Sequence, residues 1–341
     1  MATKTTADNR AGLYEAMSAN DLTPLWDIYR QLVVSEPGRQ EPSMHWSWET
    51  LEPVVALSTE TITGKDADHR VLLLKNPHLP GPPKTTSNII AGIQCVLPGE
   101  KTEPHRHTPA ALRVVLEGVG GSTFVDGKSC PMHAGDFIVT PNWTWHCHEN
   151  DSPARVAWVD ILDVPLVGSL DAVFGDYGPT GNYPDNLAAL PDNSFACGGL
   201  VPVTDREGTP HTPRMRYAWQ EVVTALEATP EDDDGARKLR YANPVDGGSV
   251  ISTLDAYAME LAPDRETRRT RTTANAVCVV IEGQGESRIG DTTHRWTARD
   301  VFTVPHWSWT SHKAHGGPAR LIMVTDRELF DRLDLLREET D

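Results

Sequence analysis

Two pairs of histidines stand in the sequence with one residue between the members of each pair, His105 and His107 and then His146 and His148. Alternate residues of a β-strand point to the same face, so each pair can present two imidazoles to one ion. Neutral imidazole is a ligand for iron, copper, zinc and nickel. The chain has 13 histidines, so one such pair carries little weight. Two pairs close together predict a metal site.

The second half of the chain repeats the segments around these histidines but not the histidines themselves. LRVVLEGVG (112–120) aligns with VCVVIEGQG (277–285), and GDFIVTPNWTWHCH (135–148) aligns with RDVFTVPHWSWTSH (299–312). The two alignments keep the same spacing to within one residue, which predicts an internal duplication. Three of the histidines face threonines in the repeat and the fourth is kept, the pairs being His105 and Thr270, His107 and Thr272, His146 and Thr310, and His148 and His312. Only the first copy is therefore expected to bind metal.

Residues kept in both copies are expected to serve the fold. The tryptophans are predicted to pack in the core, and the aspartates to stabilise the turn before a strand; the pairs are Trp143 and Trp307, Trp145 and Trp309, and Asp136 and Asp300. Such residues recur whether or not the histidines do. We therefore assign them no part in the chemistry.

Short apolar runs separated by turn residues fill 71–164 and return over 252–325. Many short strands at this spacing are typical of an antiparallel sandwich or barrel. Apolar residues at helical spacing predict one or two helices over 13–34, another near 217–228 and a closing helix over 326–339. The duplication therefore joins two copies of one small β-domain with helical additions.

Composition limits the possible classes of protein. The 341 residues are 39% hydrophobic and carry a formal net charge of −17, which argues against a general nucleic-acid-binding surface. No run approaches the roughly 18 apolar residues of a membrane helix. The five cysteines form no CxxC pair. They are expected to be reduced thiols of a cytoplasmic protein.

PGEKTEPHRHTPAALRVVLEG (98–118) and PMHAGDFIVTPNWTWHCH (131–148) resemble the two signature motifs of a cupin barrel. From residue 25 onward the chain resembles the bicupin gentisate 1,2-dioxygenase family, which includes salicylate and 1-hydroxy-2-naphthoate dioxygenases. The usual cupin glutamate, four or five residues after the first histidine pair, is replaced by Ala111 and Leu112. Three histidines without a carboxylate are a mark of this ring-cleaving family.

The resemblance implies an all-β fold, a bicupin of two double-stranded β-helix (jelly-roll) barrels with helical N- and C-terminal arms. The expected parts are a helical arm (1–70), a metal-bearing cupin (71–175), a linker with a helix (176–245), a metal-free cupin (246–325) and a C-terminal helix (326–341). It further implies a homotetramer, and the composition described above argues against nucleic-acid and membrane partners.

The resemblance also implies a six-coordinate Fe(II) held by His105, His107 and His146. Three neutral imidazoles leave the ion its full charge, and the remaining positions suit a carboxylate, a phenolate and O₂. The histidines alone do not separate iron from zinc, since three histidines also form hydrolytic zinc sites. A zinc or manganese cupin isomerase or hydrolase is therefore an alternative, and a metal-free binding or storage bicupin is another.

Five further residues match positions that line the family's site. Arg113 is expected to anchor the substrate carboxylate or phenolate, and His148 to bind substrate and accept its proton. Gln94 is expected to hydrogen-bond the substrate, Gly92 to leave room for its ring, and Asp160 to orient a histidine or arginine.

Arg70 matches a substrate-contacting segment in which relatives carry two adjacent arginines, and His69 replaces the first of them. The implied reaction opens gentisate (2,5-dihydroxybenzoate) with O₂, between the carboxyl-bearing and the adjacent hydroxyl-bearing carbons, to give maleylpyruvate. The departure at His69 keeps a second substrate class open. That class is a salicylate with a 5-nitro, amino or halide group, or 1-hydroxy-2-naphthoate.

Overall fold

The computed structural model describes residues 6–38, 41–63, 66, 69–178, 192–195, 202 and 211–341. The chain separates into a small N-terminal unit up to residue 39 and a large unit from residue 40. The small unit contains helices α1 (Thr6–Ser18) and α2 (Leu25–Leu32), which confirms the helices expected over 13–34. Cys197 lies outside the described residues.

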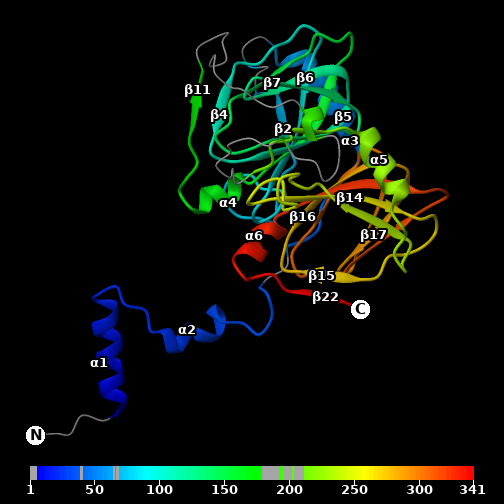
Figure 1. The fold of residues 1–341 in the computed structure, drawn as a ribbon. Helices are drawn as coiled ribbons and strands as arrows, with labels where there is room; N and C mark the ends of the chain where they lie inside the picture. Colours follow the sequence, from blue (N-terminus) through cyan, green and yellow to red (C-terminus); the bar gives the residue numbers. More distant parts are fainter. Residues whose placement is uncertain are drawn as a thin grey trace, which may run out of the picture. The chain divides into compact units, whose positions relative to one another are not determined.

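The large unit holds two β-barrels, the first drawn mainly in cyan and green and the second in yellow and orange (Figure 1). One sheet of the first barrel has the order β12 (Arg216–Tyr217), β8 (Phe137–Thr140), β5 (Ala111–Glu117), β10 (Val156–Leu162), β3 (Ile90–Val96) and β2 (Val71–Leu73). The other has the order β11 (Gly175–Tyr177), β4 (His105–His107), β9 (His146–Glu149), β6 (Val119–Val125) and β7 (Lys128–His133).

The second barrel repeats this arrangement. Its larger sheet has the order β1 (His45–Trp46), β19 (Val301–Val304), β16 (Ala276–Glu282), β21 (Ala319–Thr325), β14 (Asp255–Leu261) and β13 (Ala236–Arg240). Its smaller sheet has the order β18 (Thr292–Thr297), β17 (Gln284–Ile289), β20 (Thr310–Ala314), β15 (Thr270–Thr272) and β22 (Glu338–Thr340). The predicted duplication and the two-barrel β-fold are confirmed.

The large unit also contains α3 (Trp48–Thr61), α4 (Val164–Ser169), α5 (Trp219–Ala228), α6 (Arg327–Arg332) and a 3₁₀ turn (Asp192–Phe195). The helix expected near 217–228 is α5. The helix expected over 326–341 is too long: α6 stops at Arg332, Asp334 adopts a φ of 57°, and the chain turns into β22. No helix of the described residues is long and apolar enough to span a membrane.

Each larger sheet separates two apolar layers. On β5 of the first barrel, Leu112 and Val114 belong to a core cluster that also contains Val277 and Val279 of the second barrel. Val115 belongs instead to the core inside the first barrel. Because side chains alternate along a strand, Arg113 lies on the interior face. The same alternation places Gln94 and Asp160 inside this barrel.

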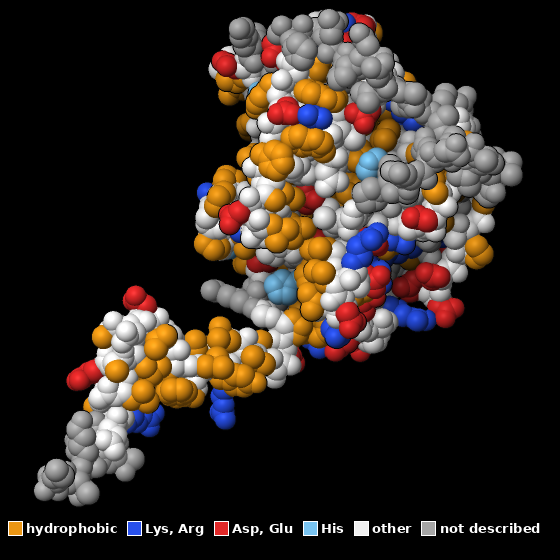
Figure 2. Space-filling model, turned by 60° about the vertical axis from the view of Figure 1, so that its left-hand side comes forward, with side chains coloured by type: hydrophobic (Ala, Val, Ile, Leu, Met, Phe, Trp, Pro, Cys, Tyr) orange, Lys and Arg blue, Asp and Glu red, His pale blue; other side chains and the backbone are white. Residues whose placement is uncertain are grey.

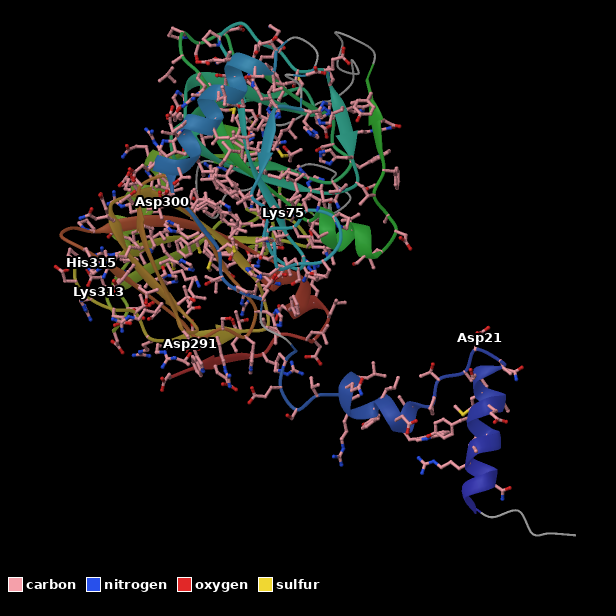
Figure 3. The ribbon with its side chains drawn as sticks, turned by 180° about the vertical axis from the view of Figure 1, so that it is seen from behind. Asp21, Lys75, Asp291, Asp300, Lys313 and His315 are labelled. Carbon is pink, nitrogen blue, oxygen red and sulfur yellow. The ribbon has the colours of Figure 1, made fainter. Side chains whose placement is uncertain are left out.

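The two copies exchange their leading strands. Strand β1 precedes the first barrel in the chain but pairs with β19 of the second, and β12 precedes the second barrel but pairs with β8 of the first. After each exchanged strand a helix begins at a tryptophan. The amide of Trp48 donates to Asp300 Oδ1 at 2.7 Å, close to the start of α3 (Figure 3). The amide of Trp219 donates to Asp136 at 2.9 Å.

Both aspartates are buried and sit before the strand that receives the exchanged segment. Asp136 also pairs with Arg216 at 2.8 Å, and Asp300 with His45 at 3.0 Å. The structural role expected for the two aspartates is confirmed. Each acid satisfies backbone amides at a helix start that would otherwise lack a partner.

Candidate metal centre and substrate pocket

Three histidines of the first barrel converge on one point. The ligand atoms of His105, His107 and His146 all lie within 4.8 Å of one another. His105 and His107 come from β4, and His146 comes from the neighbouring strand β9, where it pairs with His105. This is the only such cluster of potential ligands among the described residues. The structure therefore brings together the three predicted ligands in the first barrel.

The hydrogen bonds of these histidines leave one ring nitrogen of each available. His105 Nδ1 lies 3.0 Å from the carbonyl of Glu103, His107 Nδ1 lies 2.7 Å from that of Pro109, and His146 Nδ1 lies 3.0 Å from that of Thr144. A carbonyl accepts only, so each neutral ring donates from Nδ1 and keeps its lone pair on Nε2. Backbone carbonyls commonly fix metal-binding imidazoles in this way. The donor set fits a divalent transition metal.

Burial favours the neutral, ligating form of the rings. It lowers the pKa of His107 to about 4 and lowers the pKa of His146 and of His148 well below the usual range. The positive charge of Arg113 lowers all three values further. Protonation of such enclosed rings is unfavourable because the charged form loses its hydration.

Arg106, between the two ligands of β4, points to the other face of the strand. Its guanidinium lies 4.3 Å from the ring of Trp143 and 4.8 Å from that of Trp145. Trp143 is 36% exposed, so the core packing predicted for it is wrong. The tryptophans form a cation–π stack that ties β4 to the loop before β9. Arg271 makes the same contacts in the second barrel, at 4.4 and 4.8 Å from the rings of Trp307 and Trp309.

Arg113 and Asp160 face each other inside the barrel. They pair across β5 and β10, and Arg113 Nε lies 2.8 Å from Asp160 Oδ1. Arg113 Nη1 also donates to the hydroxyl of Thr140. Burial raises the pKa of Asp160, although Arg113 opposes the shift. The arrangement places a positive charge on the barrel wall and an acid that orients it.

His148 lies deeper in the same barrel and is 3% exposed. Its ring centroid is 6.4 Å from that of His146 and 4.6 Å from that of Trp158. Its Nδ1 lies 2.9 Å from the hydroxyl of Thr123. Of the second histidine pair, His146 therefore belongs to the cluster and His148 lies outside it.

Gln94 and Gly92 lie on β3, opposite Trp158 and Asp160 of β10. Gln94 is buried on the interior face, and its hydrogen bond to the substrate stays a prediction. A Cβ atom at Gly92 would lie 2.7 Å from Cγ1 of Val71 on the adjacent strand. Close packing against β2 thus explains the glycine, and its contact with a substrate ring stays a prediction.

Arg70 makes its contacts away from the cluster. It is buried in an ion pair with Glu100 and donates to the carbonyls of Ile62 at 2.7 Å and Cys95 at 3.1 Å. These bonds give Arg70 a structural role, and the predicted substrate contact stays a prediction. The adjacent His69 is exposed, and its ring centroid lies 6.2 Å from that of His105. His69, which replaces the family's arginine, therefore lies beside the histidine cluster, whereas Arg70 does not.

Sequence reasoning missed Tyr177 and Thr123. Tyr177 pairs with His105 through β11, and the two ring centroids are 6.2 Å apart. It stands in a stretch expected to be an irregular linker, so no pattern pointed to it. Thr123 has a counterpart in the second copy, because Ser287 contacts His312 at 2.7 Å as Thr123 contacts His148. An alignment of the two copies could therefore have pointed to Thr123, because Ser287 occupies the corresponding position.

A cavity of about 300 Å³ opens beside the cluster. Its wall includes His105, His107, Leu162, Val164, Phe174 and Tyr177. A cavity of this size, mostly apolar with a few convergent polar groups, is typical of a site for a small molecule. Its wall includes two members of the histidine cluster but not Arg113, Gln94 or His148, so the substrate contacts predicted for these three residues stay predictions.

Comparison with known proteins agrees with this geometry. Residues 92–162 match the model of the cupin domain family. The chain is 35% identical to gentisate 1,2-dioxygenase 1 of Aquipseudomonas alcaligenes, over 96% of each chain. It is 32% identical to 5-aminosalicylate 1,2-dioxygenase of a Comamonas species, over 96% of this chain and 89% of that one.

The solved structures include salicylate 1,2-dioxygenase of Pseudoaminobacter salicylatoxidans as adducts with gentisate. That structure matches with a TM-score of 0.89 and 30% identity, over 100% of this chain and 96% of the other. The match extends to both barrels, so the second barrel belongs to the shared fold. Coverage, identity and the three-histidine cluster together show that this chain belongs to the gentisate and salicylate 1,2-dioxygenase family of ring-cleaving bicupin enzymes.

Proposed function

We propose that the protein is an Fe(II)-dependent dioxygenase that opens gentisate to maleylpyruvate. The bond broken joins the carboxyl-bearing carbon to the adjacent hydroxyl-bearing carbon. The observation that carries the proposal is the cluster of His105, His107 and His146 without a carboxylate ligand. Neutral ligands keep the positive charge of a bound metal, which suits a substrate carrying a carboxylate and a phenolate.

The residues around the cluster give the substrate one orientation. Nε of Arg113 faces Asp160 and Nη1 bonds Thr140, and no bond of Nη2 is recorded among the described residues. We assign that group to the substrate carboxylate or phenolate as a charge-assisted donor. Gln94, buried on the same inner face, supplies a further hydrogen bond to the bound ring substituents.

His148 is positioned to take the phenolic proton. When its Nδ1 donates to Thr123, its Nε2 carries a lone pair that can accept a proton. Removal of that proton enriches the ring in electrons and makes it easier to oxidise. Bound Fe(II) would supply the site where the substrate oxygens and O₂ meet and the route for electrons between ring and oxygen.

A 5-substituted salicylate or 1-hydroxy-2-naphthoate is the second candidate substrate class. The favouring observation is His69, exposed beside His105 where the family pattern has an arginine. A histidine there changes the charge and shape beside His105 without adding a member to the cluster. The histidine cluster and the pair of Arg113 with Asp160 serve both classes, so His69 is the residue on which the choice depends.

Oxygen uptake by the iron-loaded protein tests the reaction and ranks the substrates. We expect kcat/KM for gentisate to equal or exceed the values for 5-nitrosalicylate and 5-chlorosalicylate, because the 5-hydroxyl donates electrons to the ring. The ratio kcat/KM is the proper measure of discrimination between competing substrates. Catechol, which lacks the carboxylate, serves as the control and should not be consumed.

The opposite order would contradict the choice of gentisate. A value for gentisate more than about tenfold below that for 5-nitrosalicylate corresponds to roughly 1.4 kcal/mol in transition-state free energy. In that event His69→Arg should shift the order back toward gentisate. Absence of oxygen uptake with every member of the panel would contradict the proposed reaction itself.

We further propose that the chain assembles into a homo-oligomer, a tetramer, through its N-terminal helices. Four large side chains of α2 lie at least half exposed, namely Leu25 (55%), Trp26 (61%), Tyr29 (51%) and Leu32 (63%). Hydrophobic side chains cover much of the visible face of this arm (Figure 2). No residue of α2 is buried. Contiguous exposed apolar surface of this kind is typical of a protein–protein interface.

Deletion of residues 1–38 should therefore reduce the molecular mass of the assembly measured by light scattering. The large unit from residue 40 forms its contacts within itself, so its far-UV circular dichroism should keep the β-sheet signature. Arg10→Ser, which removes a charge from α1 but no apolar side chain, is the control and should leave the mass unchanged. An unchanged mass after the deletion would show that the arm does not hold the subunits together.

The four described cysteines support a cytoplasmic location. Cys95, Cys130, Cys147 and Cys278 are buried and form no disulfide bond. Free thiols persist in a reducing compartment.

The proposed reaction requires O₂ and a small aromatic acid as partners. We propose no nucleic-acid partner and no association with a membrane.

A further inference from the structure

The second barrel contains a cavity of about 360 Å³ where the first barrel holds its histidine cluster. Its wall includes Thr270, Thr272 and Thr310, which replace the three ligands, and His312, which matches His148. Among the described residues no metal-binding cluster forms here. The space is nevertheless retained, and it is lined by hydroxyl and charged groups.

Lys238 projects from β13 into this cavity. It pairs with Met259 as Val71 pairs with Gln94 in the first barrel, so an ammonium group replaces an aliphatic side chain. Its Nζ lies 4.6 Å from the centroid of the Tyr257 ring. The side chain is exposed to solvent, and partial desolvation of the ammonium group by the neighbouring barrel atoms lowers its pKa.

The arginines of the wall have carboxylate partners and Lys238 does not. Their ion pairs are Arg268 with Asp233 at 3.1 Å, Arg271 with Glu339 at 2.6 Å and Arg327 with Glu338 at 2.7 Å. Lys238 is the one cation of this wall for which the described residues show no ion pair, and Glu338 acts on it only at longer range. The cavity therefore offers one positive charge to a ligand.

Acids limit which anion can enter. Asp232 and Asp234 lie on the wall in the loop before β13. Asp234 accepts hydrogen bonds from the amides of Ala236 at 3.2 Å and Arg268 at 3.0 Å, whereas no side-chain bond is recorded for Asp232. Negative groups beside an anion site disfavour multiply charged ligands such as phosphate. A single negative charge is best matched to Lys238.

The rest of the wall suits a small organic molecule. Met259, Met323, Val304 and Pro305 supply apolar surface. The Nδ1 atom of His312 lies 2.7 Å from the hydroxyl of Ser287, so its other ring nitrogen is left for a ligand. An apolar wall with a few oriented polar groups is the usual composition of a small-molecule site.

We propose that the second barrel binds a small organic monocarboxylate, with the carboxylate on Lys238 and the carbon skeleton against Met259 and Met323. The first barrel uses an arginine on β5 for its anion, and the second uses a lysine on β13. The duplication has thus kept an anion pocket in each barrel and the metal ligands in one. Binding in the second barrel requires no metal.

Equilibrium dialysis of salicylate with the iron-loaded full chain, under anaerobic conditions, tests the proposal. Two molecules should bind per chain, and Lys238→Met should leave one, with the second weakened at least about tenfold by loss of a charge-assisted bond. Lys238→Arg should keep both. Lys313→Met is the matched control and should also keep both, because Lys313 lies on the outer side of the second barrel and outside the cavity wall (Figure 3).

If Lys238→Met binds as many molecules of salicylate per chain as the intact protein does, whatever that number is, the proposal is overturned. Displacement of salicylate from the second site by millimolar inorganic phosphate would overturn the assignment to a monocarboxylate. The iron content and melting temperature of Lys238→Met should match those of the intact chain, which separates loss of a ligand from loss of the fold. Oxygen uptake is not the readout, so the outcome is independent of the reaction proposed for the first barrel.

Discussion

His146→Ala should abolish both iron binding and oxygen uptake. His146 is 1% exposed and pairs with His105 across β9 and β4. The cluster has no fourth member among the described residues, so no other side chain can supply the missing nitrogen. Loss of a group that only hydrogen-bonds to a metal ligand already costs about 10- to 100-fold in metal affinity or activity. Loss of a ligand itself should cost more, and oxygen uptake should fall below about one hundredth. Metal analysis and oxygen consumption give the two measurements.

His312→Ala is the matched control, because His312 belongs to the copy that lacks the other histidines. Iron should stay close to one per chain in this variant, since the cluster in the described residues is confined to the first barrel. Two irons per intact chain, or loss of iron from His312→Ala, would show that the second barrel also binds metal. Circular dichroism of both variants separates loss of iron from loss of structure.

Arg113→Ala should raise KM by about 10- to 100-fold while iron stays bound. A charge-assisted contact contributes roughly 1.5–3 kcal/mol to binding, which corresponds to that range. Arg113 is 3% exposed and faces Asp160 across the interior of the barrel, so solvent does not screen its charge. Steady-state oxygen uptake gives KM, and metal analysis verifies the iron content.

Removal of Arg113 also leaves Asp160 buried without its partner, which destabilises a protein by about 3–5 kcal/mol. Arg113→Lys keeps a charge and should lose less affinity. Asp160→Asn removes the acid but keeps the guanidinium, and it should raise KM less than Arg113→Ala does. Normal substrate binding by Arg113→Ala, at full iron content, would show that the arginine serves only its ion pair.

The two barrels and the histidine cluster could be predicted because they leave regular signals in the sequence. Strands β5 and β16 are seven-residue, mostly apolar runs that are buried along most of their length, and the repeated segments keep their spacing. The pairs of histidines at alternate strand positions follow from the same geometry. Local patterns therefore account for the cluster before any long-range contact is known.

The exchanged strands could not be predicted. Strands β1 and β12 have two residues each, too few to show periodicity, and their partners lie in the other barrel. The packing of Arg70 with Glu100 and the closeness of His69 to His105 are also long-range properties. The shortened α6 depends on a left-handed backbone at Asp334, a position with no glycine to mark it.

The exchange of β1 and β12 explains why a barrel without metal ligands has been retained. A gene encoding only the first barrel would keep every histidine of the cluster but lack β12, which closes one edge of its larger sheet. Asp136 would then face water in place of the amide of Trp219. After duplication the second copy was thus free to change its chemistry but not its shape. The two barrels therefore depend on each other for their fold as the subunits of an obligate dimer do, although both belong to one chain.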